Sequence, residues 1–139
     1  MIDIVNGQRD RQINQKHWRD FAARAIEVIG NRREAVTIVF VSDSAIRKLN
    51  KQFRDTDRVT DVLSFPAEPE HFENQSSLGE IVISTDRAAA QAKANGLSLQ
   101  NEIEQLILHG LLHLCGYDHE TDNGEMDRLE LKLRKKLGI

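Results

Sequence analysis

Residues 35–41 read AVTIVFV, an almost continuous run of apolar and β-branched side chains. A run of this length and composition is typical of a strand that is covered on both faces, as in a parallel sheet. Ser42 or Asp43 follows directly and can cap a helix, which we expect to extend to about Phe53. This stretch therefore predicts a buried central strand that leads straight into a helix.

Strands and helices alternate on both sides of this stretch. Before it, residues 2–5 are expected to form a short strand, and residues 14–29 carry apolar side chains at helical spacing before Gly30 ends the helix. After it, the sequence predicts strands at 62–65 and 81–83, an exposed loop at 67–77, and helices from Thr85 or Asp86 to Asn95, from Ser98 to about Cys115, and at 125–137. This order predicts an α/β (α+β) fold in which helices surround a mixed, mostly parallel four-stranded sheet.

The composition is that of a soluble globular chain. Hydrophobic residues make up 40% and charged residues 29% of the 139 residues, and no repeat or linker divides the chain. We therefore expect residues 1–139 to form a single domain. The start of the chain lacks the pattern of a secretory signal, no apolar stretch is long enough to span a bilayer, and the single cysteine cannot form an internal disulfide. These features predict a cytoplasmic protein with no membrane partner.

The net charge of −3 argues against a broad nucleic-acid-binding surface, because such binding depends on many lysine and arginine contacts to phosphates. A local exception lies within residues 47–58, where the basic residues outnumber the acidic ones; they are Arg47, Lys48, Lys51, Arg54 and Arg58. Taken alone, such a run is more typical of a solvated helix face than of a binding site.

Residues 109–119 read HGLLHLCGYDH and contain the pattern with the clearest chemistry. On a helix, His109 and His113 lie about 40° apart at the edge of an apolar stripe, so both rings can reach one metal ion. Gly116 ends the helix and permits a turn through which His119 can approach as a third ligand. Three neutral imidazoles suit zinc and leave the fourth tetrahedral position open, as in catalytic sites. The same nitrogen ligands also bind nickel, cobalt or copper; of these metals we predict zinc, with one ion per chain.

The other histidines and the cysteine lack such a context. A lone histidine is more often a hydrogen-bonded core or rim residue than a ligand, and the pair at 109 and 113 alone would leave both interpretations open. His17 and His71 are therefore expected at the surface. Cys115 is predicted to be a small buried apolar residue, because on the helix it lies away from the edge that carries the histidines.

At residues 109–119 the sequence resembles the YbeY family of bacterial endoribonucleases, whose motif H-G-x-L-H-L-x-G-Y-D-H it matches at every fixed position. The similarity extends to LNKQFR at 49–54, TDVLSFP at 60–66 and LGEIVI at 78–83. Val59 stands where the family often has proline, and Glu80 stands where it often has aspartate. Neither difference affects a predicted ligand.

The resemblance implies a zinc-dependent, single-strand-specific endoribonuclease. Such an enzyme acts in the 3′ maturation of small-subunit ribosomal RNA and in ribosome quality control. The implied partners are single-stranded RNA, ribosomal RNA and the small ribosomal subunit or its associated proteins. The implied fold is a mixed sheet with helices around it, in agreement with the pattern of strands and helices above.

The resemblance also implies the residues of the site. The implied zinc ligands are His109, His113 and His119. Arg54 would be the functional arginine near the metal, where its guanidinium can contact phosphate and stabilise charge on the transferring group. Without the resemblance, a surface salt bridge from Arg54 to Asp55, Asp57 or Asp61 is the simpler interpretation.

A metalloprotease fits part of the same pattern. The metzincin motif also has His-x-x-x-His followed by glycine and a third histidine, but it has a glutamate general base where this chain has Gly110. Glu102 shares the histidine face but lies about 10 Å further along the helix axis, too far for a direct replacement. Asp118 can either orient a histidine or form a turn. The sequence therefore assigns no general base.

A second alternative is a ribosome-assembly factor that binds RNA or protein partners and uses the metal only for stability. The missing general base favours this function, whereas the open fourth ligand position argues against it. Chelation separates the two cases. A structural metal predicts unfolding on removal, and a catalytic metal predicts a retained fold with lost activity.

Overall fold

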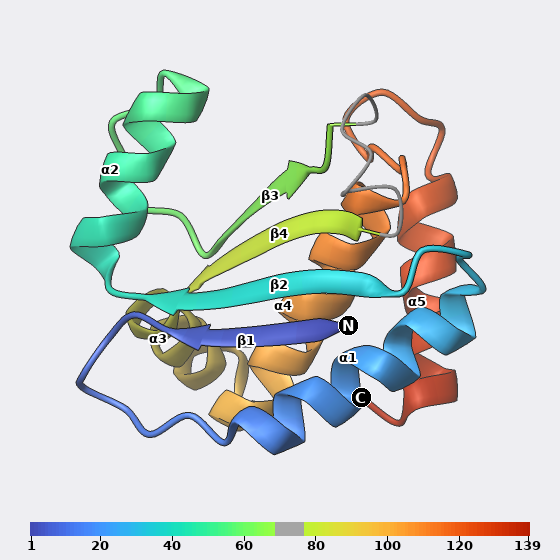
Figure 1. The fold of residues 1–139 in the computed structure, drawn as a ribbon, viewed down its shortest axis with the longest axis horizontal. Helices are drawn as coiled ribbons and strands as arrows, with labels where there is room; N and C mark the ends of the chain where they lie inside the picture. The colour runs from blue at the N-terminus through green and yellow to red at the C-terminus, as the bar shows by residue number, and fades with distance from the viewer. Residues whose placement is uncertain (69–76) are drawn as a thin grey trace.

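The structure is a computed structural model that describes residues 1–68 and 77–139 (Figure 1). Its strands are β1 (Ile2–Asn6), β2 (Ala35–Val41), β3 (Val62–Pro66) and β4 (Ser77–Ser84). Its helices are α1 (Gln15–Ile29), α2 (Asp43–Arg54), α3 (Thr85–Asn95), α4 (Leu99–Leu114) and α5 (Glu125–Leu137). Most of the loop expected at 67–77, together with His71, lies outside the described residues.

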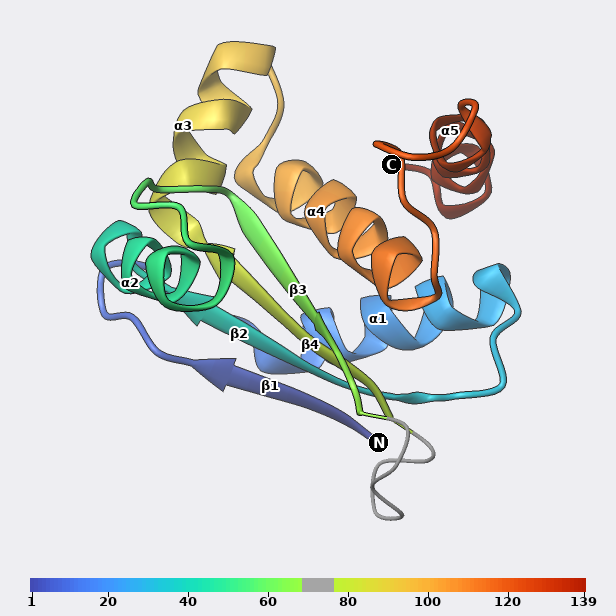
Figure 2. The ribbon, with the colours of Figure 1, turned by 90° about the horizontal axis from the view of Figure 1, so that it is seen from above.

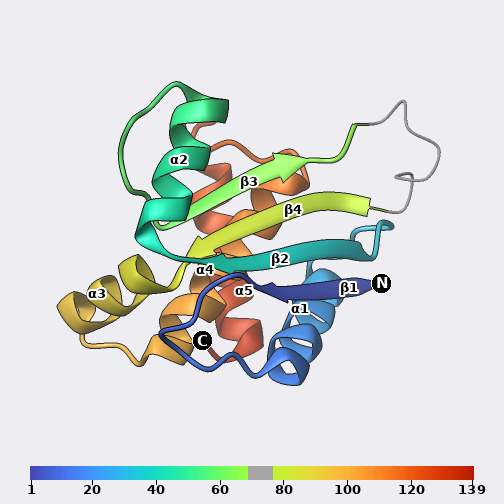
Figure 3. The same ribbon diagram turned by 60° about the vertical axis from the view of Figure 1, so that its left-hand side comes forward.

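The four strands form one sheet in the order β1-β2-β4-β3, which Figure 3 shows as neighbouring ribbons. The β1–β2 and β2–β4 pairs are parallel, and the β3–β4 pair is antiparallel. The predicted mixed, mostly parallel sheet is therefore confirmed. Because β3 is an edge strand, the residues on it can border an open cleft as well as the core.

The two faces of the sheet are covered unequally. Figure 2 shows α1, α4 and α5 on one side, where they share a large apolar core with Ile38, Phe40 and Ile81. The opposite face carries a small cluster in which Ile46 of α2 packs on Val82 and its neighbours. The prediction that β2 is covered on both faces is confirmed in part: each face meets an apolar cluster, but buried and half-buried residues alternate along most of the strand, because α2 covers only part of its second face.

Serine side chains begin three of the helices. Ser42 Oγ accepts a hydrogen bond from Ala45 N at the start of α2, and Ser98 Oγ accepts one from Asn101 N at the start of α4. At α3 the cap is Ser84, whose Oγ accepts from Arg87 N, and not Thr85 or Asp86 as expected. The Thr85 side chain is instead buried, and the Asp86 carboxylate accepts bonds from Arg11 and from the backbone of Asp43.

Helix α4 lies directly against β4. A Cβ atom built on Gly110 would lie 3.0 Å from two carbon atoms of Ile81, so glycine permits this close approach. Ile107 and Leu111, on the same side of α4, are fully buried.

Within the described residues, no helix has both the length and the apolar character needed to cross a membrane.

Candidate metal centre

The structure brings His109, His113 and His119 together at the end of α4. One ring nitrogen from each residue lies within 4.8 Å of the corresponding nitrogens of the other two. Nε2 of His109 lies 3.1 Å from Nε2 of His113, as the spacing of four residues on a helix predicts. His109 and His113 are half-buried and His119 is exposed, so the cluster lies at the surface end of the helix.

The outward nitrogens of the two helix histidines each meet a hydrogen-bond acceptor. Nδ1 of His109 lies 2.8 Å from a carboxylate oxygen of Glu130, and Nδ1 of His113 lies 3.0 Å from the backbone oxygen of Tyr117. An oxygen acceptor at each Nδ1 places the ring proton there. In the neutral rings both Nε2 atoms therefore carry lone pairs, and these face each other.

Two lone pairs at 3.1 Å repel each other unless a cation lies between them. Zinc binds imidazole nitrogen at about 2.0–2.1 Å, which separates two tetrahedral ligands by roughly 3.3 Å. Burial and the neighbouring charge of His109 lower the pKa of His113, which favours the neutral ring that a metal needs. The donor set thus fits one metal ion.

Glu130 on α5 was missed by the sequence reasoning. Its side chain is only 12% exposed and holds His109 through one oxygen, while its other oxygen accepts a hydrogen bond of 3.0 Å from Arg134. Burial alone would raise the pKa of Glu130, but the hydrogen bond and charge of His109 lower it by more. The spacing of Glu130 and Arg134, four residues apart on α5, was the only signal in the sequence, and it does not indicate which side of α5 faces α4.

The loop after α4 carries His119 back toward the helix. Gly116 has φ +99°, a conformation that favours glycine, and Tyr117 N donates a hydrogen bond to Leu112 O. Asp118 then forms a turn, because its side chain accepts from Glu120 N and its backbone oxygen accepts from Asp122 N. Of the two roles considered for Asp118, the structure therefore supports turn formation.

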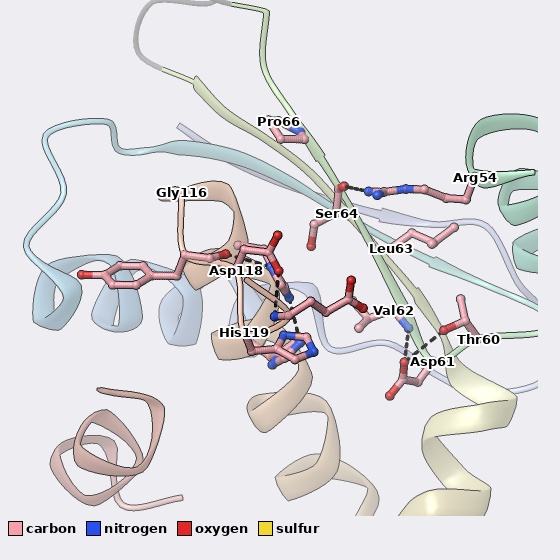
Figure 4. Close-up of a pocket in the computed structure, with 14 residues that line it drawn as sticks. Arg54, Thr60, Asp61, Val62, Leu63, Ser64, Pro66, Gly116, Asp118 and His119 are labelled. Carbon is pink, nitrogen blue, oxygen red and sulfur yellow. Dashed lines mark hydrogen bonds between the residues drawn. The ribbon is translucent and has the colours of Figure 1, made fainter. Parts of the chain in front are cut away.

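An open cleft of about 680 Å³ lies beside the histidines (Figure 4). Residues 116–120 line it on one side, and residues 60–64 with Pro66 line it on the other. Arg54, the last residue of α2, also lines it. Figure 4 shows Arg54 reaching from α2 to β3, where its Nη2 donates a hydrogen bond of 2.7 Å to Ser64 O.

The salt-bridge interpretation of Arg54 is wrong for the part of the chain that the structure describes. Arg54 makes no ion pair there with Asp55, Asp57 or Asp61, and Asp57 instead pairs with Arg47 at 2.8 Å. The Arg54 guanidinium lies 5.8 Å from the centre of the Phe65 ring. Its position on the cleft wall agrees with the expectation that it lies near the proposed metal site.

Gly110 leaves no place for the glutamate of a metzincin. A side chain at this position would point at Ile81 on β4 and not into the cleft, so the side chain of a glutamate would collide with the sheet. Glu102, the other carboxylate considered, does not line the cleft. The geometry thus supplies neither of the general bases considered for the protease alternative.

The other two side chains considered from the sequence are half-buried. His17, expected at the surface, packs edge-on against Trp18 with ring centres 4.6 Å apart. Cys115 lies beside the core, and its sulfur accepts a hydrogen bond of 3.3 Å from Asn31. Burial raises the pKa of the Cys115 thiol. Neither residue belongs to the histidine cluster.

Comparison with known proteins gives one consistent result. The model of the family described as "Endoribonuclease YbeY" matches residues 3–138. A relative of that name from Nautilia profundicola is 50% identical over 75% of this chain and 73% of its own. Another, from Finegoldia magna, is 38% identical over 100% of this chain and 95% of its own. A solution structure of a Thermotoga maritima protein matches 99% of this chain and 89% of its own with a TM-score of 0.65 at 29% identity.

Proposed function

The chain belongs to the YbeY family of endoribonucleases, and from this premise we propose that it is a zinc-dependent endoribonuclease specific for single-stranded RNA. Its role is the 3′ maturation of small-subunit ribosomal RNA and ribosome quality control in the cytoplasm. Residues 1–139 form the single catalytic domain, and its partners are ribosomal RNA and the small ribosomal subunit or its associated proteins. The proposed zinc ligands are His109, His113 and His119.

The observation that carries this proposal is the convergence of three imidazole nitrogens at the wall of an open cleft. A structural zinc site is usually closed by four protein ligands, whereas a three-ligand site leaves a position for a reactant. When bound, a divalent ion supplies Lewis-acid chemistry toward a phosphate oxygen or water. The hydrogen bonds that the two helix imidazoles donate from Nδ1 to Glu130 and to Tyr117 O fix the orientation of the rings before any ligand arrives.

Arg54 supplies positive charge on the same cleft. Its hydrogen bond to Ser64 O uses one N–H group and holds the side chain in place, so the other N–H groups can bind phosphate oxygens. A guanidinium held in this way stabilises the negative charge that grows on a phosphate during cleavage. Arg54 is therefore the proposed phosphate-binding catalytic residue.

Preference for single strands is consistent with where the cleft lies. The proposed ligands and Arg54 border the cleft between edge strand β3 and the loop at 116–120. An RNA chain therefore has to enter the cleft to reach them. Proteins that act on single-stranded RNA commonly use unpaired bases as well as phosphates for recognition. A duplex keeps its bases paired and stacked and is expected to enter poorly.

The test is cleavage of a labelled single-stranded RNA and of its duplex by wild-type protein and three variants purified identically. His113→Ala is expected to abolish cleavage, and Arg54→Ala to reduce it by about 100-fold, as for loss of one donor to a transition-state anion. Arg47→Ala is the matched control, because Arg47 lies on the same helix but pairs with Asp57 at the surface. Equal cleavage by His113→Ala and wild type would overturn the proposal and indicate a contaminating nuclease.

A further inference from the structure

A second pocket of about 390 Å³ adjoins the histidine cleft. The two share Asp61, Val62 and His109, so a ligand in the cleft can extend into the pocket. Its other walls come from Asn95 at the end of α3, from the first half of α4, which contributes Glu102 and Gln105, and from Arg134 on α5. The pocket is therefore continuous with the proposed catalytic site but is not part of it.

Glu102 is the unusual residue of this pocket. It is only 6% exposed, yet within residues 1–68 and 77–139 its carboxyl group accepts no hydrogen bond and forms no ion pair. Burial and the nearby charge of Asp61 raise its pKa, against the opposing charge of Arg134. Its carboxyl oxygens are not among the buried polar atoms that lack a partner, because Glu102 lines the open pocket and its oxygens stay accessible there. A ligand that donates hydrogen bonds to these oxygens would favour the charged carboxylate over the neutral acid.

The chemistry of the pocket selects among the parts of an RNA strand. Asp61 and Glu102 place two carboxyl groups on it, and the guanidinium of Arg134 is already paired with Glu130, so the pocket disfavours a phosphate and attracts N–H donors. Val62 and Leu106 add apolar surface that suits the face of a planar ring. The amide group of Gln105 can pair with an oxygen or nitrogen acceptor. These features fit a nucleobase better than they fit a phosphate or a ribose.

Among the four bases, guanine matches a carboxylate best. Its N1–H and its N2 amine lie side by side and can donate to both oxygens of one carboxylate. Adenine and cytosine place an acceptor nitrogen beside their amine, and uracil places carbonyl oxygens on both sides of its N–H, so each puts an acceptor against a carboxylate oxygen. The edge that guanine would use is its pairing edge, which is free only in unpaired RNA.

We propose that this pocket binds an unpaired guanine of the RNA substrate, with the carboxylate of Glu102 accepting hydrogen bonds from N1–H and the N2 amine. The proposal rests on the endoribonuclease function proposed above, because it places the guanine close to the phosphate that is cut. It gives that function a preference for sequences with guanine near the cleavage position. It also gives a reason for single-strand specificity, since a paired guanine has no free edge.

The test uses mononucleotides, which the enzyme cannot cut. Guanosine, inosine, adenosine, cytidine and uridine monophosphates are titrated into ¹⁵N-labelled holoprotein, and the side-chain amide signals of Gln105 and Asn95 are followed by NMR. Guanosine monophosphate is expected to bind about tenfold more tightly than inosine monophosphate, which lacks only the N2 amine, because one hydrogen bond to a charged group is lost. Glu102→Gln should remove this difference.

Glu104→Gln is the matched control, because Glu104 is also a partly buried glutamate of α4 but lies outside the pocket. It should keep the preference for guanosine monophosphate. Equal binding of the guanosine and inosine nucleotides by wild type, an absence of binding, or an unchanged preference in Glu102→Gln would overturn the proposal. If the protein preferred guanosine monophosphate but cut no RNA, the nuclease function would be refuted, whereas guanine binding by the pocket would still be supported.

Discussion

Helix α4 and the loop at 115–124 both contribute to the histidine cluster, but they hold their side chains in different ways. On α4 the core-facing side is buried, and each histidine is oriented by one hydrogen bond at its Nδ1. In the loop His119 is exposed, and its position depends on Gly116 and on the turn formed by Asp118. Two of the three proposed ligands are therefore preorganised by the core, and the third depends on a short exposed turn.

The largest expected effect comes from removing a ligand of the helix rather than that of the loop. His113→Ala is expected to lower zinc affinity by more than about 100-fold, beyond the range found for loss of a supporting partner. His119→Ala should lower it less, because the preorganised pair on α4 stays intact. Competition with a chromophoric zinc chelator measures both affinities. A larger loss in His119→Ala than in His113→Ala would reverse the comparison.

A smaller effect is expected from removing the support of a helix ligand. Glu130→Gln keeps the shape of the side chain but weakens its bond to Nδ1 of His109, and should lower zinc affinity by about 10- to 100-fold. Asp127→Asn is the control, since Asp127 is an exposed acidic residue of the same helix. The same chelator competition applies. An equal change in both variants would mean that only the overall charge of α5 matters.

Strain in the loop is expected to act more weakly still. Gly116→Ala forces a side chain into φ +99° and should cost on the order of 1 kcal/mol of stability. This is about 3 °C in Tm for a chain of this size. Gly30→Ala provides the comparison, because Gly30 has φ +82°, similarly open surroundings and a place at the end of α1. Both variants should lose similar Tm, but only Gly116→Ala should also bind zinc several-fold more weakly.

The smallest expected effect concerns the end of the loop. Backbone hydrogen bonds from Met126 and Gly124 hold the pKa of Asp122 below its ordinary value of 3.8. A carboxyl whose pKa is lower in the folded state adds stability above its unfolded pKa and loses it as the pH falls through the lowered value. Asp122→Asn should therefore unfold at lower urea concentration than wild type at pH 7. If this difference persisted undiminished at pH 2 to 3, Asp122 would not act through its charge.

The same contrast between α4 and the loop describes what the sequence can predict. Within residues 1–68 and 77–139, local patterns identified each strand and helix, and for residues 35–41 and 125–137 the bounds agree with β2 and α5. The approach of His119 to the helix pair could also be anticipated, because Gly116 permits the turn. Such inferences depend on a few neighbouring residues and on the period of the element.

Contacts between distant elements were not predictable in this way. Glu130 reaches His109 only because α5 packs beside α4, and Tyr117 supports His113 through a backbone oxygen that any residue type would supply. The charge pattern around Arg54 suggested a salt bridge, but its partner is the backbone oxygen of Ser64. From the sequence, Glu102 could be considered only as a carboxylate too far from His109 to act as its general base. Its burial was not predictable, because it depends on how β3 and α5 pack around α4.

Reconstitution of RNA cleavage by metal tests the central claim most directly. Protein stripped of metal by a chelator should keep its circular dichroism spectrum, because its apolar core is built from the sheet and helices and not around the histidines. It should not cut single-stranded RNA, and titration with zinc should restore cleavage with an endpoint at one ion per chain. Full cleavage by metal-free protein would contradict a metal-dependent nuclease, and unfolding on chelation would indicate a structural ion instead.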